Sequence, residues 1–278
     1  MIYKNLILSS FIFIISCSPK AFIIDQPELV SIYFEKKIKK LEKSDMTSLD
    51  QQRDLMRTKV EYGFGIIMEH ADRLIDVDYS SALDKYKKAN IIFKDARDSG
   101  ISILNDRYLN FNDWLRGGVE LQFTNNDIID LYWLAAAYGG AISSSRGDPF
   151  ELIHLPKVGR ILRKCIELDP EWNNGAVYSA MMSFTSTRTD ISEDLLRDSV
   201  DFYFNKAILY SDSLDAGPFL AYAESIHKTY QERKEFEDKL NYVIDMKTKS
   251  RSRYELPNLI AKNRAEWLLS KTDDYFLE

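Results

Sequence analysis

Apolar residues recur at helical spacing in almost every long segment from Gln51 to the C-terminus. An α-helix turns once every 3.6 residues, so this spacing gathers the apolar side chains on one face of each helix. No run of alternating β-branched residues indicates a half-buried strand. The pattern therefore predicts an all-α fold.

Four segments share a further spacing, with apolar or small residues at positions i, i+4 and i+7. The second helix of a tetratricopeptide repeat has this spacing, often followed by a proline, and Leu168-Asp169-Pro170 fits that ending. The four sets are Ala82, Tyr86 and Ala89; Val158, Leu162 and Cys165; Val200, Phe204 and Ala207; and Phe236, Leu240 and Val243. Their order predicts stacked helical hairpins in a degenerate tetratricopeptide-like array. Any amphipathic helix has the same spacing, so an unrelated helical bundle is the alternative.

Each of these helices needs a partner to form a hairpin. We expect the partner helices at residues 57–76, 128–143, 176–184 and 218–228. Asp148-Pro149 and Gly217-Pro218 are typical of helix starts, because proline suits the first helical position. Residues 108–123 are expected to form a further helix, and residues 256–270 a helix that closes the array.

The first residues have the pattern of a lipoprotein signal peptide over residues 1–16. Lys4 precedes an apolar run at residues 6–15, which is too short for a permanent transmembrane helix of about 20 residues. Ile14-Ile15-Ser16-Cys17 then resembles a bacterial lipobox. We expect lipidation of Cys17, since more than one acyl chain gives stable anchoring. An ordinary secretory signal with an incidental cysteine is the alternative.

The pattern divides the mature chain into a lipid anchor with a charged tether, residues 17–50, and a helical domain, residues 51–278. The tether contains Pro19, Pro27 and five lysines between residues 36 and 43, and we expect it to lead into one loosely packed helix. These lysines are expected either to form a solvated helix face or to contact anionic lipid headgroups.

Composition and charge narrow the possible partners. Hydrophobic residues make up 45% of the chain, enough for a sizeable core. Once Cys17 carries lipid, Cys165 is the only other cysteine, so no internal disulfide can form. The net charge of −6 and the lack of a basic stripe argue against nucleic acid as a partner.

Motifs for catalysis, metal binding or cofactor binding are missing from the sequence. His70, His154 and His227 lie far apart, and none has a second histidine or cysteine at metal-ligand spacing. Gly117-Gly118 and Gly139-Gly140 lack the further glycines and the lysine of a phosphate-binding loop, and we expect them to allow close helix packing. We therefore expect no enzyme and no cofactor.

Aromatic residues are concentrated on the first helices of the proposed hairpins. They are Tyr132, Trp133, Tyr138, Tyr178, Phe184, Phe219 and Tyr222. We expect four of them to line an apolar groove or channel for a hydrophobic ligand or a partner peptide: Trp133, Tyr138, Phe184 and Tyr222. Filling of the core is the alternative for each ring.

Several motifs in the C-terminal half occur in an order found in one protein family. They lie at residues 131–143, 148–149, 155–158, 168–170, 172, 175–176, 204–207, 216–218, 223–225, 263–269 and 273–274. Together they resemble the T component of TRAP transporters, the TatT family, over residues 128–278. Residues 51–123 fit the family only in general pattern.

The resemblance implies a lipoprotein with cryptic tetratricopeptide-like helices and an apolar channel, assembling as a trimer. It predicts an accessory component of a TRAP-type transport system, anchored in the bacterial cell envelope through its lipid and facing the periplasm. Its expected partners are the periplasmic solute-binding protein and a hydrophobic or organic-acid ligand. The alternative is a tetratricopeptide-like scaffold lipoprotein for envelope protein assembly.

Overall fold

The computed structural model describes residues 27–44, 48–250 and 252–277. The described residues form helices joined by turns, with no β-strand among them, which confirms the predicted all-α fold. The helices are α2 (Pro27–Glu42), α3 (Leu49–Tyr62), η1 (Gly63–Met68), α4 (Glu69–Leu74), α5 (Tyr79–Asn105), α6 (Phe111–Leu115), η2 (Asn125–Asp127), α7 (Ile128–Ser144), α8 (Pro149–Leu152), α9 (Leu155–Leu168), α10 (Trp172–Thr185), α11 (Glu193–Tyr210), α12 (Gly217–Tyr222), η3 (Ala223–His227), α13 (Arg233–Asp245), α14 (Glu255–Leu269) and α15 (Thr272–Tyr275).

The four sets of spaced residues lie on α5, α9, α11 and α13, and every member of each set is buried. The sequence therefore predicts the packed face of these four helices correctly. A tetratricopeptide-like repeat remains a prediction, because burial at this spacing is common to all packed amphipathic helices.

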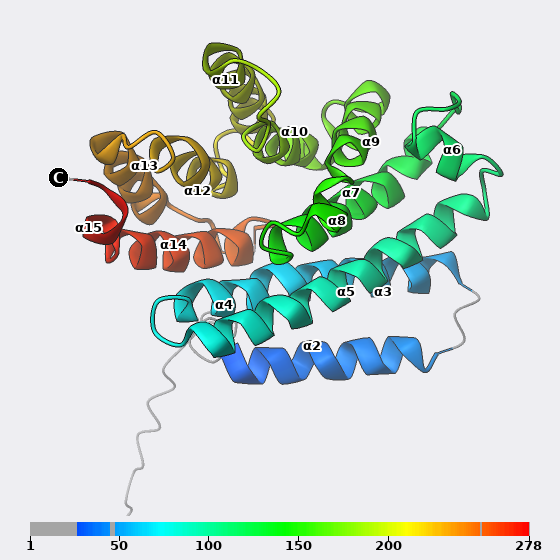
Figure 1. Ribbon diagram of the computed structural model, residues 1–278, viewed down its shortest axis with the longest axis horizontal. Helices are drawn as coiled ribbons and strands as arrows, with labels where there is room; N and C mark the ends of the chain where they lie inside the picture. Colours follow the sequence, from blue (N-terminus) through cyan, green and yellow to red (C-terminus); the bar gives the residue numbers. More distant parts are fainter. Residues whose placement is uncertain (1–26, 45–47, 251, 278) are drawn as a thin grey trace, which may run out of the picture.

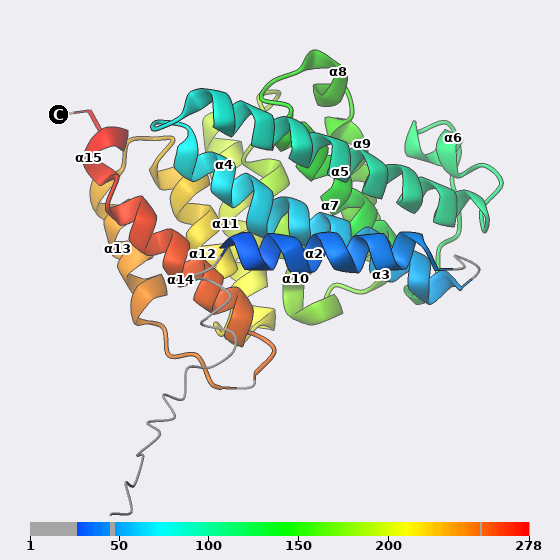
Figure 2. The same ribbon diagram turned by 90° about the horizontal axis from the view of Figure 1, so that it is seen from below.

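Helices that follow one another in the chain pack as hairpins (Figure 1). The long helix α5 contacts both α3 and α7, α7 contacts α9, α10 contacts α11, and α13 contacts η3 and α14. Figure 1 shows α2, α3, α4 and α5 together on one side of the molecule, and Figure 2 shows α13, α14 and α15 at one end and α6 at the other. The closing helix expected at residues 256–270 corresponds to α14.

Helix α2 lies in the segment expected to be a tether leading into one loosely packed helix, and it packs against the body. Val30 is buried, and the ring of Phe34 stacks on Tyr62 of α3 with the ring centroids 5.4 Å apart. Helix α2 therefore packs against the predicted helical domain, and the division of the chain at residue 51 remains a prediction. Residues 1–26, which include the signal peptide and the lipidation expected at Cys17, lie outside the described residues.

Two glycines allow three helical segments to approach one another closely. The ring of Phe93 on α5 packs against Gly63 and Gly140, where an added Cβ would lie 2.4 and 2.3 Å from ring atoms. Such a short approach excludes any larger residue unless the ring moves. Close packing was expected for both glycines of α7, but a Cβ on Gly139 would meet no atom within 4 Å.

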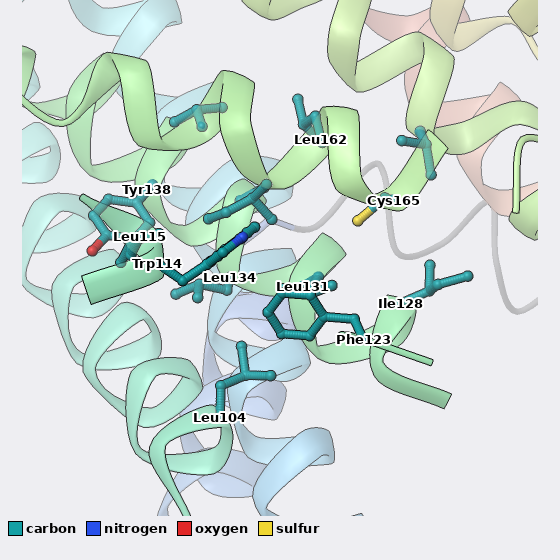
Figure 3. Packing of buried hydrophobic residues seen from close by; sticks show 14 of the residues in the cluster. Leu104, Trp114, Leu115, Phe123, Ile128, Leu131, Leu134, Tyr138, Leu162 and Cys165 are labelled. Carbon is teal, nitrogen blue, oxygen red and sulfur yellow. The ribbon is translucent and has the colours of Figure 1, made fainter. Parts of the chain in front are cut away.

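The largest core cluster lies between α7, α9 and the segment around α6 (Figure 3). The helix expected at residues 108–123 is wrong in extent, because only the residues of α6 form an α-helix there. Gly117 has a φ of 86°, a left-handed conformation that commonly ends a helix. The chain then continues without helix to Phe123, whose ring centroid lies 4.7 Å from that of Trp114.

Candidate functional site

A large cavity lies among helices from all parts of the described chain. Its volume is about 1020 Å³. Ligand pockets commonly measure about 300–1,000 Å³, so this one is at the upper end. Residues of α2, α3, η1, α7, α8, α9, α10, α12 and α14 line it, and most of their side chains are apolar or small.

The N-terminal side of the cavity is built on the π turn η1. A π turn interrupts the regular α-helical repeat and is frequent at functional sites. Here three consecutive residues, Phe64, Gly65 and Ile66, all line the cavity. A Cβ on Gly65 would meet no atom within 4 Å. The same is true of Gly139 of α7, which also lines the cavity. Small residues therefore keep this space open.

Helix α7 carries both core residues and cavity residues, which explains why it is apolar around almost its whole circumference. Leu131 and Leu134 are fully buried in the cluster of Figure 3, whereas Ala136, Gly139 and Ile142 line the cavity. An apolar helix surface that also faces an open space is typical of a ligand-binding wall.

Two of the four predicted lining residues, Trp133 of α7 and Phe184 of α10, line this cavity. Tyr132 lines it as well, with its ring centroid 5.4 Å from that of Trp133. The ring of Phe184 packs over Gly159 of α9, where an added Cβ would lie 2.5 Å from a ring atom. The structure therefore brings two predicted aromatic residues to one apolar site.

Tyr138 and Tyr222 do not line the cavity, because their rings are part of the core. Tyr138 is 2% exposed and belongs to the cluster in Figure 3. Tyr222 is 9% exposed and donates its hydroxyl to Asp201 at 2.5 Å. Five residues separate Trp133 from Tyr138, a rotation of about 140° around an α-helix, so the two rings point to different sides. Core filling, the alternative for each ring, accounts for these two tyrosines.

Glu61 of α3 is a lining residue that the sequence does not reveal. Among the described residues it is the one charged side chain that lines the cavity. Its nearest cationic atom is Nε of Arg57 at 3.8 Å, while the same guanidinium makes a closer contact, 2.8 Å, to Asp54. The side chain is 44% exposed, but it lies in a hollow surrounded by protein, and this burial raises the pKa of Glu61.

A second hollow, of about 460 Å³, contains Asp72 of α4, Glu224 of η3 and Arg264 of α14 in its lining, together with Asp76, Arg146 and Lys228. At its centre Arg264 makes ion pairs with Asp72 at 2.9 Å and Glu224 at 2.7 Å, and also contacts Glu69. Burial opposes the charge of Arg264, but the hydrogen bonds to Glu224 and the nearby carboxylates raise its pKa above the usual value. These ion pairs connect α14 to α4, two helices that are far apart in the sequence.

Reactive side chains near the apolar cavity are few. Burial raises the pKa of the Cys165 thiol to about 12, so the thiol is protonated and unreactive at neutral pH. Burial also lowers the pKa of His154 below its usual value. Within the ranges that the structure describes, no three side chains of His, Cys, Asp or Glu could hold a metal ion. The arrangement is suited to reversible binding of an apolar molecule.

Fold and cavity thus define a helical protein with a large apolar cavity. The family model of the TRAP transporter T-component matches residues 28–276, so the chain belongs to this family of transport accessory components. The match confirms the resemblance seen in the C-terminal half and extends it to the N-terminal helices. It also indicates a place in the bacterial cell envelope.

One relative is an uncharacterized protein of Treponema pallidum (strain Nichols). It is 20% identical over 231 residues, which cover 80% of this chain and 71% of the relative. In the described ranges, no helix is both long enough and apolar enough to span a membrane.

Proposed function

We propose that this chain is a lipid-anchored accessory component of a TRAP-type transport system that holds a hydrophobic ligand in its central cavity. The observation that carries this proposal is a cavity of about 1020 Å³ lined almost entirely by apolar and small side chains. Water finds few hydrogen-bond partners in such a space, whereas an apolar ligand buries its surface there favourably. Trp133 and Phe184 are the aromatic contacts that we assign to the ligand.

We further propose that the periplasmic solute-binding protein docks beside the cavity, at α8. Leu152 of α8 lines the cavity, while the adjacent Phe150 and Ile153 are 79% and 67% exposed. Exposed apolar side chains of this kind support a protein interaction site. A partner at this position could pass a ligand into the cavity without its crossing open water.

The lipid on Cys17 has the role of an anchor in this proposal. It would hold the helical body at the membrane surface, facing the periplasm, and raise the effective concentration of the partner there. We propose that the mature chain assembles as a trimer.

Native mass spectrometry of a chain that begins at Ser18 tests ligand, partner and assembly together, since this chain keeps every residue that the structure describes. It is recorded alone and mixed with the solute-binding protein encoded beside its gene. We expect a defined complex and a co-purified apolar mass. A protein that carries no ligand and forms no complex with this partner would contradict the proposal and favour the envelope assembly scaffold.

A matched pair of variants tests the docking position. Phe150→Ser should weaken the complex with the solute-binding protein and leave ligand binding unchanged. Leu109→Ser, which alters a 95% exposed leucine near α6, is the control and should leave the complex unchanged. Equal behaviour of the two variants would contradict docking at α8.

A further inference from the structure

The charges around the apolar cavity are asymmetric. Arginine, lysine and histidine side chains are missing from its lining in the described part of the chain, whereas Glu61 contributes one carboxylate. The lining therefore offers a hydrogen-bond acceptor but no cation. An anionic headgroup would have to enter without a counter-charge, which is unfavourable in an apolar site.

The carboxylate of Glu61 is also not fully engaged by the protein. Its distance of 3.8 Å to Arg57 is too long for a normal hydrogen bond. The neighbouring Asp54 binds both Arg57, at 2.8 Å, and Lys37, at 3.1 Å, so these two cations already have a closer partner. Glu61 thus retains acceptor capacity at the wall of the cavity.

The surroundings of Glu61 fit a headgroup that continues into a long apolar tail. Val60 precedes it, Phe64 follows it three residues later, and both line the same cavity, as does Phe34 of α2. From this side the space extends towards Trp133 and the C-terminal helices. A single chain-like ligand can therefore place its polar end at Glu61 and its tail along the apolar lining.

We infer that the cavity selects amphiphiles whose headgroup donates hydrogen bonds, either a neutral hydroxyl or an ammonium group, and that Glu61 is the residue that recognises this headgroup. Long-chain carboxylates are disfavoured, because they bring a second negative charge to the same place. This inference rests on the proposed ligand-binding function and makes its ligand class specific.

Equilibrium dialysis tests the inference with three ligands of equal chain length: dodecylamine, dodecanol and dodecanoate. Each is used below its micelle concentration, at pH 7.5, with the chain that begins at Ser18. We expect dodecylamine and dodecanol to bind at least about tenfold more tightly than dodecanoate, which corresponds to about 1.4 kcal/mol. Glu61→Gln should abolish the preference for dodecylamine and improve dodecanoate binding.

Glu120→Gln is the matched control, because it removes the same charge from a side chain that is 77% exposed and does not line the cavity. It should leave all three affinities unchanged. Equal binding of dodecanoate and dodecylamine by the unaltered chain, or the same shift in both variants, would overturn the role of Glu61 while the proposed cavity function stands. Failure of all three ligands to bind would instead overturn that function, and this inference with it.

Discussion

The two hollows of this molecule differ in how completely the charged side chains in each are paired with opposite charges of the protein. In the smaller one, Arg264 is surrounded by the carboxylates of Glu69, Asp72 and Glu224, so charges on separate helices neutralise one another. The larger one contains a single, loosely paired carboxylate, and the rest of its lining is almost entirely apolar or small. We therefore interpret the smaller hollow as an ion-pair cluster that stabilises the fold, and the larger one as a cavity suited to binding a ligand.

Arg264→Met gives the largest expected effect, because it removes the cation shared by the partly buried carboxylates of Glu69, Asp72 and Glu224. Breaking a buried ion pair in this way costs about 3–5 kcal/mol of the free energy of unfolding, and we expect about 3 here. Urea denaturation measures the loss. Arg233→Met is the control, since its partners Glu237 and Asp273 lie at the surface. Equal destabilisation by both variants would contradict the structural role of the polar hollow.

Gly140→Ala should have the next largest effect. The added Cβ would lie 2.3 Å from the ring of Phe93, and overpacking of this kind costs about 1–3 kcal/mol. Alanine gains about 1 kcal/mol over glycine in helix propensity, so a net loss of up to about 2 kcal/mol remains. Thermal unfolding measures it, and a variant more stable than the parent would contradict the close packing of α5 and α7.

Gly139→Met should have the opposite sign, although the substituted residue is adjacent. Its Cβ meets no atom within 4 Å, so the side chain extends into the apolar cavity. Better helix propensity should add up to about 1 kcal/mol to the free energy of unfolding. Dialysis with dodecanol should show about tenfold weaker binding, about 1.4 kcal/mol. Unchanged dodecanol binding would contradict use of this part of the cavity.

Glu61→Gln should have the smallest effect on stability, and one that depends on pH. Burial raises the pKa of Glu61 in the folded protein, so the folded state becomes relatively less stable as the pH rises through that pKa. The amide cannot ionise, so the variant should be more stable than the parent at pH 7.5 and equal to it at pH 4. Since the side chain is partly exposed, we expect less than about 1 kcal/mol, measured by thermal unfolding. A variant less stable at pH 7.5 would contradict this sign.

Much of the fold can be predicted from local pattern, because helical spacing reports which face of each helix is buried. Val158, Leu162 and Cys165 are all buried on α9, and the expected helix at residues 128–143 corresponds to α7. The end of α6 is not predictable in this way, since it depends on the left-handed conformation of Gly117.

The cavity is predictable only in part, because periodicity does not say which helix lies opposite a given face. Trp133 and Tyr138 look equivalent in the sequence, yet one lines the cavity and the other fills the core. Glu61 looks like an ordinary residue on the polar face of a helix. Only the packing of α3 and η1 against α7 brings it to an apolar wall.

A crystal structure of the chain that begins at Ser18 with 12-bromododecanol tests the central claim most directly, because bromine can be located by its anomalous scattering. We expect one strong bromine peak inside the apolar cavity, near Trp133 and Phe184, with the hydroxyl end of the ligand towards Glu61. Ordered ligand found only on the exposed surface of α8, with the cavity free of it, would contradict the account.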